Sequence, residues 1–467
     1  MSRPALLLAA TLLTAGCASM APRHERPPLP VAPAYPQTTA QDAAGPAVAD
    51  IGWRQVFTDA RLRQLIELAL QGNRDLRVAA ATVEQLSARA QAQAASLWPT
   101  LNTGVSASRQ ATTSGNAVTT YSAGVLVPGY EVDFFGRLRS LTDAAQAQAL
   151  AAEEGRRTVH IALVAAVAAT HVALLADDEL LAITQRTLDT RNESLRLIRL
   201  RVERGTASEL DLQQAVSLVA NARATLAAGQ RQRAIDENAL VALLGQPLPG
   251  DLPAPGALAA WSAGTALPAG LPSALLERRP DIRAAEAQLV AAEANLGAAR
   301  AAFFPQVTLT ASAGTISSEL SGLFKSGSWG FSAASQLLVT LFDAGRNRAN
   351  RQAAEAALAI AVAQYDKAVQ TAFREVADAL AGRSTLGDQL DALKEQERAD
   401  AERVRIAELR FRNGVASSLD VLDAQRSLFA TQQQVLQLQL AQVQNQVTLY
   451  KVLGGGWHRD AAAGARS

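Results

Sequence analysis

An internal duplication is the feature that most constrains the fold of this chain. Residues 75–77 (Asp-Leu-Arg) recur at 281–283 as Asp-Ile-Arg, and residues 97–99 (Leu-Trp-Pro) recur at 303–305 as Phe-Phe-Pro, both 206 positions later. Three further segments recur 209 positions later: 136–137 at 345–346, 204–211 at 413–420, and 244–245 at 453–454. One structural motif is therefore used twice, and only the segment that follows Pro99 has changed length relative to its counterpart.

Each copy predicts a helix, two strands, a very long helix and a further helix. Pro99 and Pro305 end the first helix of each copy, because the residue before a proline avoids helical backbone angles. Apolar and polar residues then alternate, which is the pattern of strands with one apolar face. The strands are predicted at about 100–113 and 119–133 in the first copy, and at about 306–317 and 328–342 in the second.

The long helices follow from the absence of proline after Gly136 and Gly345. Residues 137–204 would form a helix of about 100 Å, at 1.5 Å per residue. Its apolar residues repeat every seven positions, as do those of the helices that follow Gly205 and Gly414. A strict seven-residue repeat predicts left-handed coiled coils, here antiparallel across these two glycine turns.

The number of strands predicts an oligomer. Each chain supplies four strands, whereas a bacterial membrane barrel made from a single chain needs at least about eight. A single chain would therefore leave two strand edges unpaired. Two copies give eight strands and an interior filled by side chains, whereas three copies give twelve strands, which can enclose a channel.

The aromatic residues favour a membrane barrel over a soluble β-domain. They gather at the two ends of the predicted strands, as Trp and Tyr do at the two membrane–water interfaces. The alternative is that they are ordinary core residues, since aromatics favour strands in any setting. The expected membrane-interface aromatics are Trp98, Phe304, Phe134, Phe342 and Trp329.

The N-terminus predicts a lipoprotein. Residues 1–16 have the layout of a short secretory signal that ends in small residues, and the chain's single cysteine, Cys17, follows directly. We expect lipidation of Cys17 and anchoring in outer-membrane lipid; the alternative is an incidental buried cysteine. Ala18 and Ser19 come next, without the Asp that retains lipoproteins at the inner membrane.

Composition argues against several function classes. The 44 Lys and Arg balance 43 Asp and Glu, so no strong positive field is available for nucleic acid. One Cys and four His leave little material for disulfide frameworks, zinc sites or nucleophilic triads. We therefore expect no enzyme activity, no cofactor and no metal site. The apolar stretch 158–176 continues the seven-residue repeat and carries two His, which predicts a packed helix rather than a membrane span.

Five segments give the sequence its resemblance to a known family. They are 131–137 (EVDFFGR), 278–286 (RRPDIRAAE), 341–346 (LFDAGR), 419–426 (LDVLDAQR) and 449–457 (LYKVLGGGW). In this order the chain resembles the TolC-like outer-membrane factors of tripartite efflux and type I secretion systems, and most closely their NodT-type, OprM-like lipoprotein branch. It departs from their pattern at Thr14 of the signal and at Phe411, where a Tyr is common.

The resemblance implies a mainly α fold with a transmembrane β-barrel part. Three chains would form a 12-stranded barrel and a 12-helix periplasmic coiled-coil tunnel. A periplasmic adaptor protein and an inner-membrane RND-type pump would be its partners. The expected boundaries are a signal at 1–16, a lipid-anchored extended segment at 17–60, repeats at 61–245 and 281–454, a Pro-rich connector at 246–280 and a disordered tail at 455–467.

The resemblance also implies where the tunnel narrows. Leu419, Asp420 and Asp423 would form the periplasmic aperture, with Leu210 and Asp211 as their counterparts in the first repeat. Three copies of a carboxylate near one axis repel one another, which would raise their pKa values. The alternative for these aspartates is a place at a helix start, where the helix dipole favours negative charge.

Two further features belong to the same implied site. Arg412 and Arg204, just before the turns, would form salt bridges that hold the closed state. The turns at Gly205 and Gly414 would be the tips at which the adaptor docks; as plain helix ends they would need glycine in any case.

The expected function is an outer-membrane exit duct for drugs or other small toxic solutes. Two alternatives remain open. One is the same duct serving type I protein secretion, since selectivity would lie in the pump. The other is a periplasmic coiled-coil adaptor anchored by lipid, although an adaptor needs no strands with a lipid-facing side.

Overall fold

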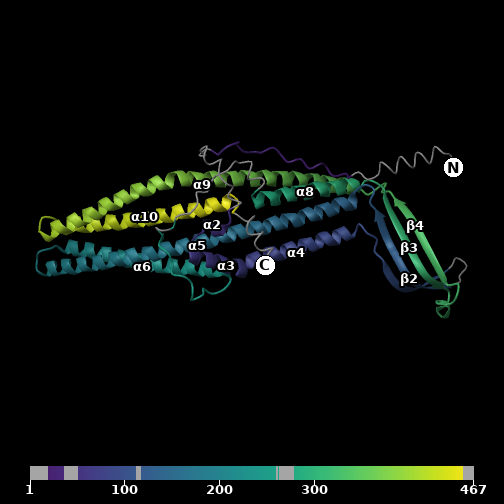
Figure 1. Ribbon diagram of the computed structural model, residues 1–467, viewed down its shortest axis with the longest axis horizontal. Helices are drawn as coiled ribbons and strands as arrows, with labels where there is room; N and C mark the ends of the chain where they lie inside the picture. The colour runs from purple at the N-terminus through teal and green to yellow at the C-terminus, as the bar shows by residue number, and fades with distance from the viewer. Residues whose placement is uncertain (1–18, 36–50, 112–116, 259–260, 262–277, 456–467) are drawn as a thin grey trace. The chain divides into compact units, whose positions relative to one another are not determined.

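The computed structural model describes residues 19–35, 51–111, 117–258, 261 and 278–455 (Figure 1). The predicted signal, Cys17 and the tail beyond residue 455 lie outside these residues. Contacts divide the chain into two compact units. The strand unit comprises residues up to Leu29 with Ala80–Glu154 and Ala284–Ala368, and the tip unit comprises Pro30–Ala79, Gly155–Arg283 and the chain from Val369 onward.

The predicted order of elements occurs twice, which confirms the duplicated fold. After α2 (Trp53–Val56) and α3 (Ala60–Gly72), the first copy is α4 (Arg74–Ala95), β1 (Asn102–Ala111), β2 (Ala117–Val132), α5 (Arg137–Glu203) and α6 (Glu209–Leu244). The second copy is α8 (Pro280–Ala301), β3 (Gln306–Ser317), a 3₁₀ turn (Leu320–Gly322), β4 (Trp329–Leu338), α9 (Arg346–Arg412) and α10 (Ser418–Val452). β4 ends earlier than expected because β3 begins at Gln306, the partner of Leu338, and offers no residue to pair with those beyond it.

The strand unit contains one antiparallel sheet in the order β1-β2-β3-β4, whose strands lie side by side in Figure 1. β1 and β4 are its edges, each paired on one side only. All ten residues of β1 are exposed, and all of β4 except Gly330 are exposed as well. Both faces and one edge of each outer strand are thus left uncovered within this chain. Such edges pair with further strands.

A row of glycines crosses the sheet at one level. Gly104 of β1 pairs with Gly124 of β2, which pairs with Gly314 of β3, which pairs with Gly330 of β4. A Cβ at Gly124 would lie 2.3 Å from the carbonyl oxygen of Ala313, whereas a Cβ at Gly104 would meet nothing within 4 Å. The two central strands therefore approach too closely for a side chain at this level, a use of glycine typical of bent strands.

In the tip unit, the end of α6 contacts the start of α4, and the end of α10 contacts the start of α8. Asn73 caps α4 by accepting a hydrogen bond from the Leu76 N–H at 2.9 Å, and its amide donates to the Leu243 carbonyl of α6 at 2.9 Å. In the second repeat, Arg279 performs the corresponding task by donating to the Val452 carbonyl of α10 at 2.9 Å. Equivalent places in the duplication thus use different side chains for the same junction.

Apolar side chains of the seven-residue repeats form the core between the long helices of the tip unit. Leu188 of α5 packs with Val219 and Ala222 of α6. Nearer the turns, Ile198 of α5 packs with Ala215 of α6 and Leu422 of α10. Burial of these seams supplies the main stabilisation of helices this long, because helix propensity alone contributes little.

α5 also buries three polar residues at seven-residue spacing: Asp177, Thr184 and Arg191 are 8%, 1% and 2% exposed. Burial raises the pKa of Asp177 to about 7, and a hydrogen bond with the Asp236 carboxyl and the negative charges of Asp236 and Asp178 act in the same direction. Polar residues in a coiled-coil seam cost stability and specify register.

One helix among the described residues, α5, contains an 18-residue window apolar enough to cross a membrane, and 56% of that window is buried within the protein. His171, in the stretch expected to pack, is 2% exposed. Burial lowers the pKa of His171 to about 4, so this imidazole is neutral at physiological pH.

The glycine row gives a prediction for the sheet. Gly124→Val should destabilise the protein by ~1–3 kcal/mol, the usual range for overpacking, because the new side chain meets the backbone of β3. Gly129→Val, on the same strand but where a Cβ would make an ordinary contact 3.5 Å from the Thr308 side chain, is the matched control. Thermal unfolding of the two purified variants checks this, and equal melting temperatures would contradict it.

Candidate aperture at the helical tips

The two turns of the tip unit have the same construction (Figure 1). Gly205 and Gly414 adopt positive φ angles of 71° and 75°, which glycine tolerates without strain. The N–H of the residue after each glycine donates to a helix carbonyl five positions earlier, at 2.8 Å for Thr206 and 2.9 Å for Val415. This is the Schellman type of helix end. Both glycines are therefore required by the turns, whatever binds to them.

A capping box starts the helix after each turn. In α6 the Asp211 N–H donates to the Ser208 hydroxyl at 3.2 Å, and the Ser208 N–H donates to the Asp211 carboxylate at 3.1 Å. In α10 the Asp420 N–H donates to the Ser417 hydroxyl at 3.3 Å, and the Ser417 N–H donates to the Asp420 carboxylate at 3.1 Å. Asp211 and Asp420 thus both satisfy backbone donors at helix starts, which is the alternative that the sequence left open.

Asp211 also connects the two hairpins. The buried Ser418 hydroxyl of α10 donates to Asp211 Oδ1 at 2.6 Å. This hydrogen bond, with that from the Ser208 hydroxyl, holds the pKa of Asp211 below its usual value. Within one chain the pKa shift is therefore opposite to the rise expected for carboxylates gathered around an axis. The sequence analysis did not identify Ser418. A signal was present, because the two repeats differ at this position: Glu209 occupies the equivalent place in the first repeat.

Asp423 is held by two arginines. Arg403 of α9 and Arg426 of α10 each donate from Nη2 to its carboxylate at 2.5 Å. The sequence suggested Arg412 and Arg204 as the arginines of the closed state. Arg412 lies instead 3.8 Å from Glu408 of its own helix.

Arg204 is exposed in the turn that follows α5. Arg403 escaped the sequence analysis although a signal was present. It lies 11 positions before Gly414 and Asp423 lies 9 after it, so an antiparallel hairpin brings the two together.

Leu419, Asp420 and Asp423 line one groove between α9 and α10, with a volume of about 860 Å³. Arg403 and Arg410 supply positive charge to the same groove. Leu419 is 52% exposed, which is unusual for a leucine beside helices with apolar seams. The structure therefore brings three predicted aperture residues to one accessible surface. Leu210, in the first repeat, is also exposed.

Phe411, where the resemblance led us to expect Tyr, packs against an arginine. The Arg201 guanidinium lies over its ring, 4.1 Å from the centroid. A ring at this distance attracts a cation, and a hydroxyl is not needed for the contact. Phe411 thus joins the end of α9 to the end of α5.

In the strand unit, the predicted interface aromatics lie where strands meet helices or at the opposite strand ends. Trp98, Phe342 and Trp329 are 75%, 88% and 68% exposed. Phe304 stacks on Phe135 with ring centroids 4.7 Å apart. The neighbouring Phe134 is half-buried. Large exposed rings of this kind mark a surface that contacts something apolar.

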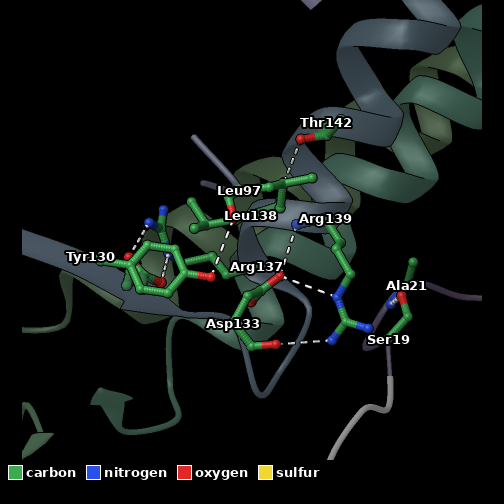
Figure 2. Close-up of polar contacts among 10 residues, drawn as sticks. Ser19, Ala21, Leu97, Tyr130, Asp133, Arg137, Leu138, Arg139 and Thr142 are labelled. Atoms are coloured by element: carbon green, nitrogen blue, oxygen red, sulfur yellow. Dashed lines mark hydrogen bonds and ion pairs between the residues drawn. The ribbon is translucent and has the colours of Figure 1, made fainter. Parts of the chain in front are cut away.

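Ion pairs fix the chain where β2 passes into α5. Arg137 donates two hydrogen bonds to Glu131, at 2.8 and 2.6 Å. Asp133 accepts from the Arg139 backbone N–H at 2.8 Å, while the Arg139 side chain reaches back to the Asp133 carbonyl at 3.0 Å (Figure 2). Residues of the 131–137 segment, together with Arg139 just beyond it, therefore fix the backbone where β2 passes into α5.

Comparison with known proteins identifies the class. The model of the outer membrane efflux protein family matches residues 65–246 and 271–455. The solvent efflux pump outer membrane protein SrpC of Pseudomonas putida is 46% identical, over 96% of this chain and 97% of its own. Outer membrane protein OprJ of Pseudomonas aeruginosa is 42% identical, over 98% and 97%.

A solved structure has the same fold. The open state of the Neisseria gonorrhoeae MtrE outer membrane channel superposes with a TM-score of 0.87 at 39% identity, over 94% of this chain and 98% of that one. The chain therefore belongs to the outer membrane efflux protein family. The resemblance read from its motifs is confirmed.

The link between the hairpins gives a prediction. Ser418→Ala and Asp211→Ala should each destabilise the protein by ~1 kcal/mol or more, and the double variant should lose less than the sum, because both remove the hydrogen bond from the Ser418 hydroxyl to Asp211. Ser384→Ala is the control, since this exposed hydroxyl donates to a carbonyl of its own helix. Thermal unfolding of the wild type, the two single variants and the double variant at neutral pH measures the coupling, with the control measured beside them. Strictly additive losses of stability would contradict the link.

The same link predicts a pH dependence. Because the folded-state pKa of Asp211 is lowered, its contribution is complete above the ordinary Asp value of about 4 and is lost as the pH falls through the folded-state pKa. The difference in the free energy of unfolding between wild type and Asp211→Asn, measured by denaturant unfolding at a series of pH values, should therefore shrink as the pH falls below about 4.

Proposed function

We propose that this protein is the trimeric outer-membrane exit duct of a tripartite efflux system. The observation that carries the proposal is the four-stranded sheet with two uncovered edge strands, β1 and β4. Three such sheets joined edge to edge supply twelve strands and leave no free edge. Membership of the outer membrane efflux protein family supports this arrangement.

The proposed cargo is drugs or other small toxic solutes, delivered by a periplasmic adaptor and an inner-membrane RND-type pump. The names of the similar proteins support an efflux role, since they include a solvent efflux pump and a toluene efflux pump outer membrane protein. We place adaptor docking at the Gly205 and Gly414 tips, which are exposed ends of the tip unit.

The proposed aperture is formed by Leu419, Asp420 and Asp423, with Leu210 and Asp211 nearby. The groove that the first three share supports this assignment. Arg403 is the proposed partner of Asp423 in the closed state, because it already donates to that carboxylate. Arg412 and Arg204 stay proposed as further salt-bridge residues of that state.

We also propose that Cys17 carries the lipid. Residues just after it lie along α8 within the strand unit, which supports an anchor close to the sheet. Arg26 donates to Glu286 at 2.8 and 3.1 Å, and His24 Nδ1 lies 2.9 Å from Glu293 Oε2. A Cβ at Gly297 of α8 would lie 2.7 Å from Ala21, so the segment packs tightly against that helix.

Channel recording tests the proposal. Purified protein in a planar bilayer should show single-channel steps, and Asp423→Ala should increase the open fraction, because it removes the ion pairs with Arg403 and Arg426 in every chain. Exposed pairs contribute less than ~1 kcal/mol each. Counting only the pair that joins α9 to α10, Arg403 with Asp423, three chains together give a shift of up to about a hundredfold.

Asp391→Ala, an exposed aspartate of α9, is the matched control and should leave the recordings unchanged. A wild type and an Asp423→Ala variant that both conduct nothing would refute the channel. Steps that are identical in the two proteins would remove Asp423 from the aperture.

A further inference from the structure

Arg191 lies at a place in the tip unit where a coiled coil normally has an apolar residue. It sits on α5 between Leu188 and Leu195 of the apolar seam, and only 2% of it is exposed. A buried cation normally needs a carboxylate beside it, because removing a charge from water is costly. Arg191 makes no salt bridge within 4.0 Å to any acidic residue of the described segments.

The contacts of Arg191 satisfy only part of its guanidinium. Nη1 donates to the Leu218 carbonyl of α6 at 2.8 Å and to the Asn221 side chain at 3.3 Å. The ring of Phe429 on α10 lies 4.9 Å from the guanidinium carbon. Nε is buried and has no hydrogen-bond partner among the described residues. Burial also lowers the pKa of Arg191, with no opposing contribution from a nearby carboxylate.

A cavity of about 420 Å³ lies beside this guanidinium. Arg186 and Thr190 line it together with Arg191, and Ile183, Val404 and Leu428 give it an apolar wall. A polar end and an apolar wall are the usual make-up of a site for a small organic molecule.

The charges around the cavity favour an anion. Arg186 and Arg191 contribute two positive charges, and Glu408 is the acidic residue of the lining. The Glu408 carboxylate is already engaged, since Gln425 Nε2 donates to it at 3.3 Å and Arg412 lies 3.8 Å away. Because Arg191 Nε has no acceptor among the described residues, this guanidinium can donate one more hydrogen bond.

We propose that this cavity binds a small carboxylic acid with an apolar body, whose carboxylate accepts hydrogen bonds from Arg191. The body of the acid packs against Ile183, Val404 and Leu428, while Arg186 adds a second positive charge. The site shares no lining residue with the groove of the aperture aspartates, and it does not depend on the proposed efflux role.

Benzoate and benzamide form a matched pair of probes, because they share a ring and differ in charge. Calorimetric titration of the purified full-length protein, at constant ionic strength, should give one benzoate site per chain. Benzamide should bind at least about tenfold more weakly, since arginine binds a charged carboxylate more strongly than a neutral amide oxygen. Equal affinities, or no benzoate binding, would overturn the proposal.

Variants assign the site. Arg191→Gln should lose the preference for benzoate, whereas Arg196→Gln, which removes an exposed arginine paired with Glu193 on the same helix, should keep it. Preference retained in Arg191→Gln would place the site elsewhere and overturn the assignment. If Arg191→Gln does not fold, a crystal structure with benzoate decides instead: a carboxylate within 3.2 Å of Arg191 supports the site, and density elsewhere refutes it.

Discussion

Unpaired strand edges are the constraint on which the rest of this structure depends. Among the described residues, the backbone groups along one side of β1 and of β4 have no strand partner, and the residues of both strands except Gly330 are exposed. In a bilayer, unsatisfied backbone groups are not tolerated, so only a closed barrel resolves the problem. In the proposed trimer, further copies of the same sheet close the barrel, and the duplication supplies each copy with two strand pairs of the same topology. The strand count is the reason that we propose a function for the assembly rather than for one chain.

The duplication explains the tip unit in the same way. In each repeat a glycine turn and a capping box join the long helix to the last helix, so the two hairpins have nearly the same backbone. Their side chains differ where the repeats must do different things. Glu209 of one repeat is replaced by Ser418 in the other, and this single change lets Asp211 bind the neighbouring hairpin.

The backbone was largely predictable, since its signals are local. Prolines predicted the ends of the first helices, and alternation of apolar and polar residues predicted the strands. Glycines predicted the turns, and apolar residues at seven-residue spacing predicted the long helices. The side-chain partners were less predictable. Arg403, Ser418 and Arg191 act through residues on other helices, and their contacts depend on the rotation of each helix about its axis, which the repeat pattern leaves open. Arg412, which the sequence suggested for its closeness to the turn, lies 3.8 Å from Glu408 of its own helix within the single chain.

The number of chains in the assembly tests the central claim most directly. Native mass spectrometry of the detergent-solubilised protein counts the chains without any reference to transport. The account predicts a complex of three chains, each close to 49.0 kDa before processing of the N-terminus. A stable monomer or dimer, with β1 and β4 protected from hydrogen exchange in that state, would contradict it.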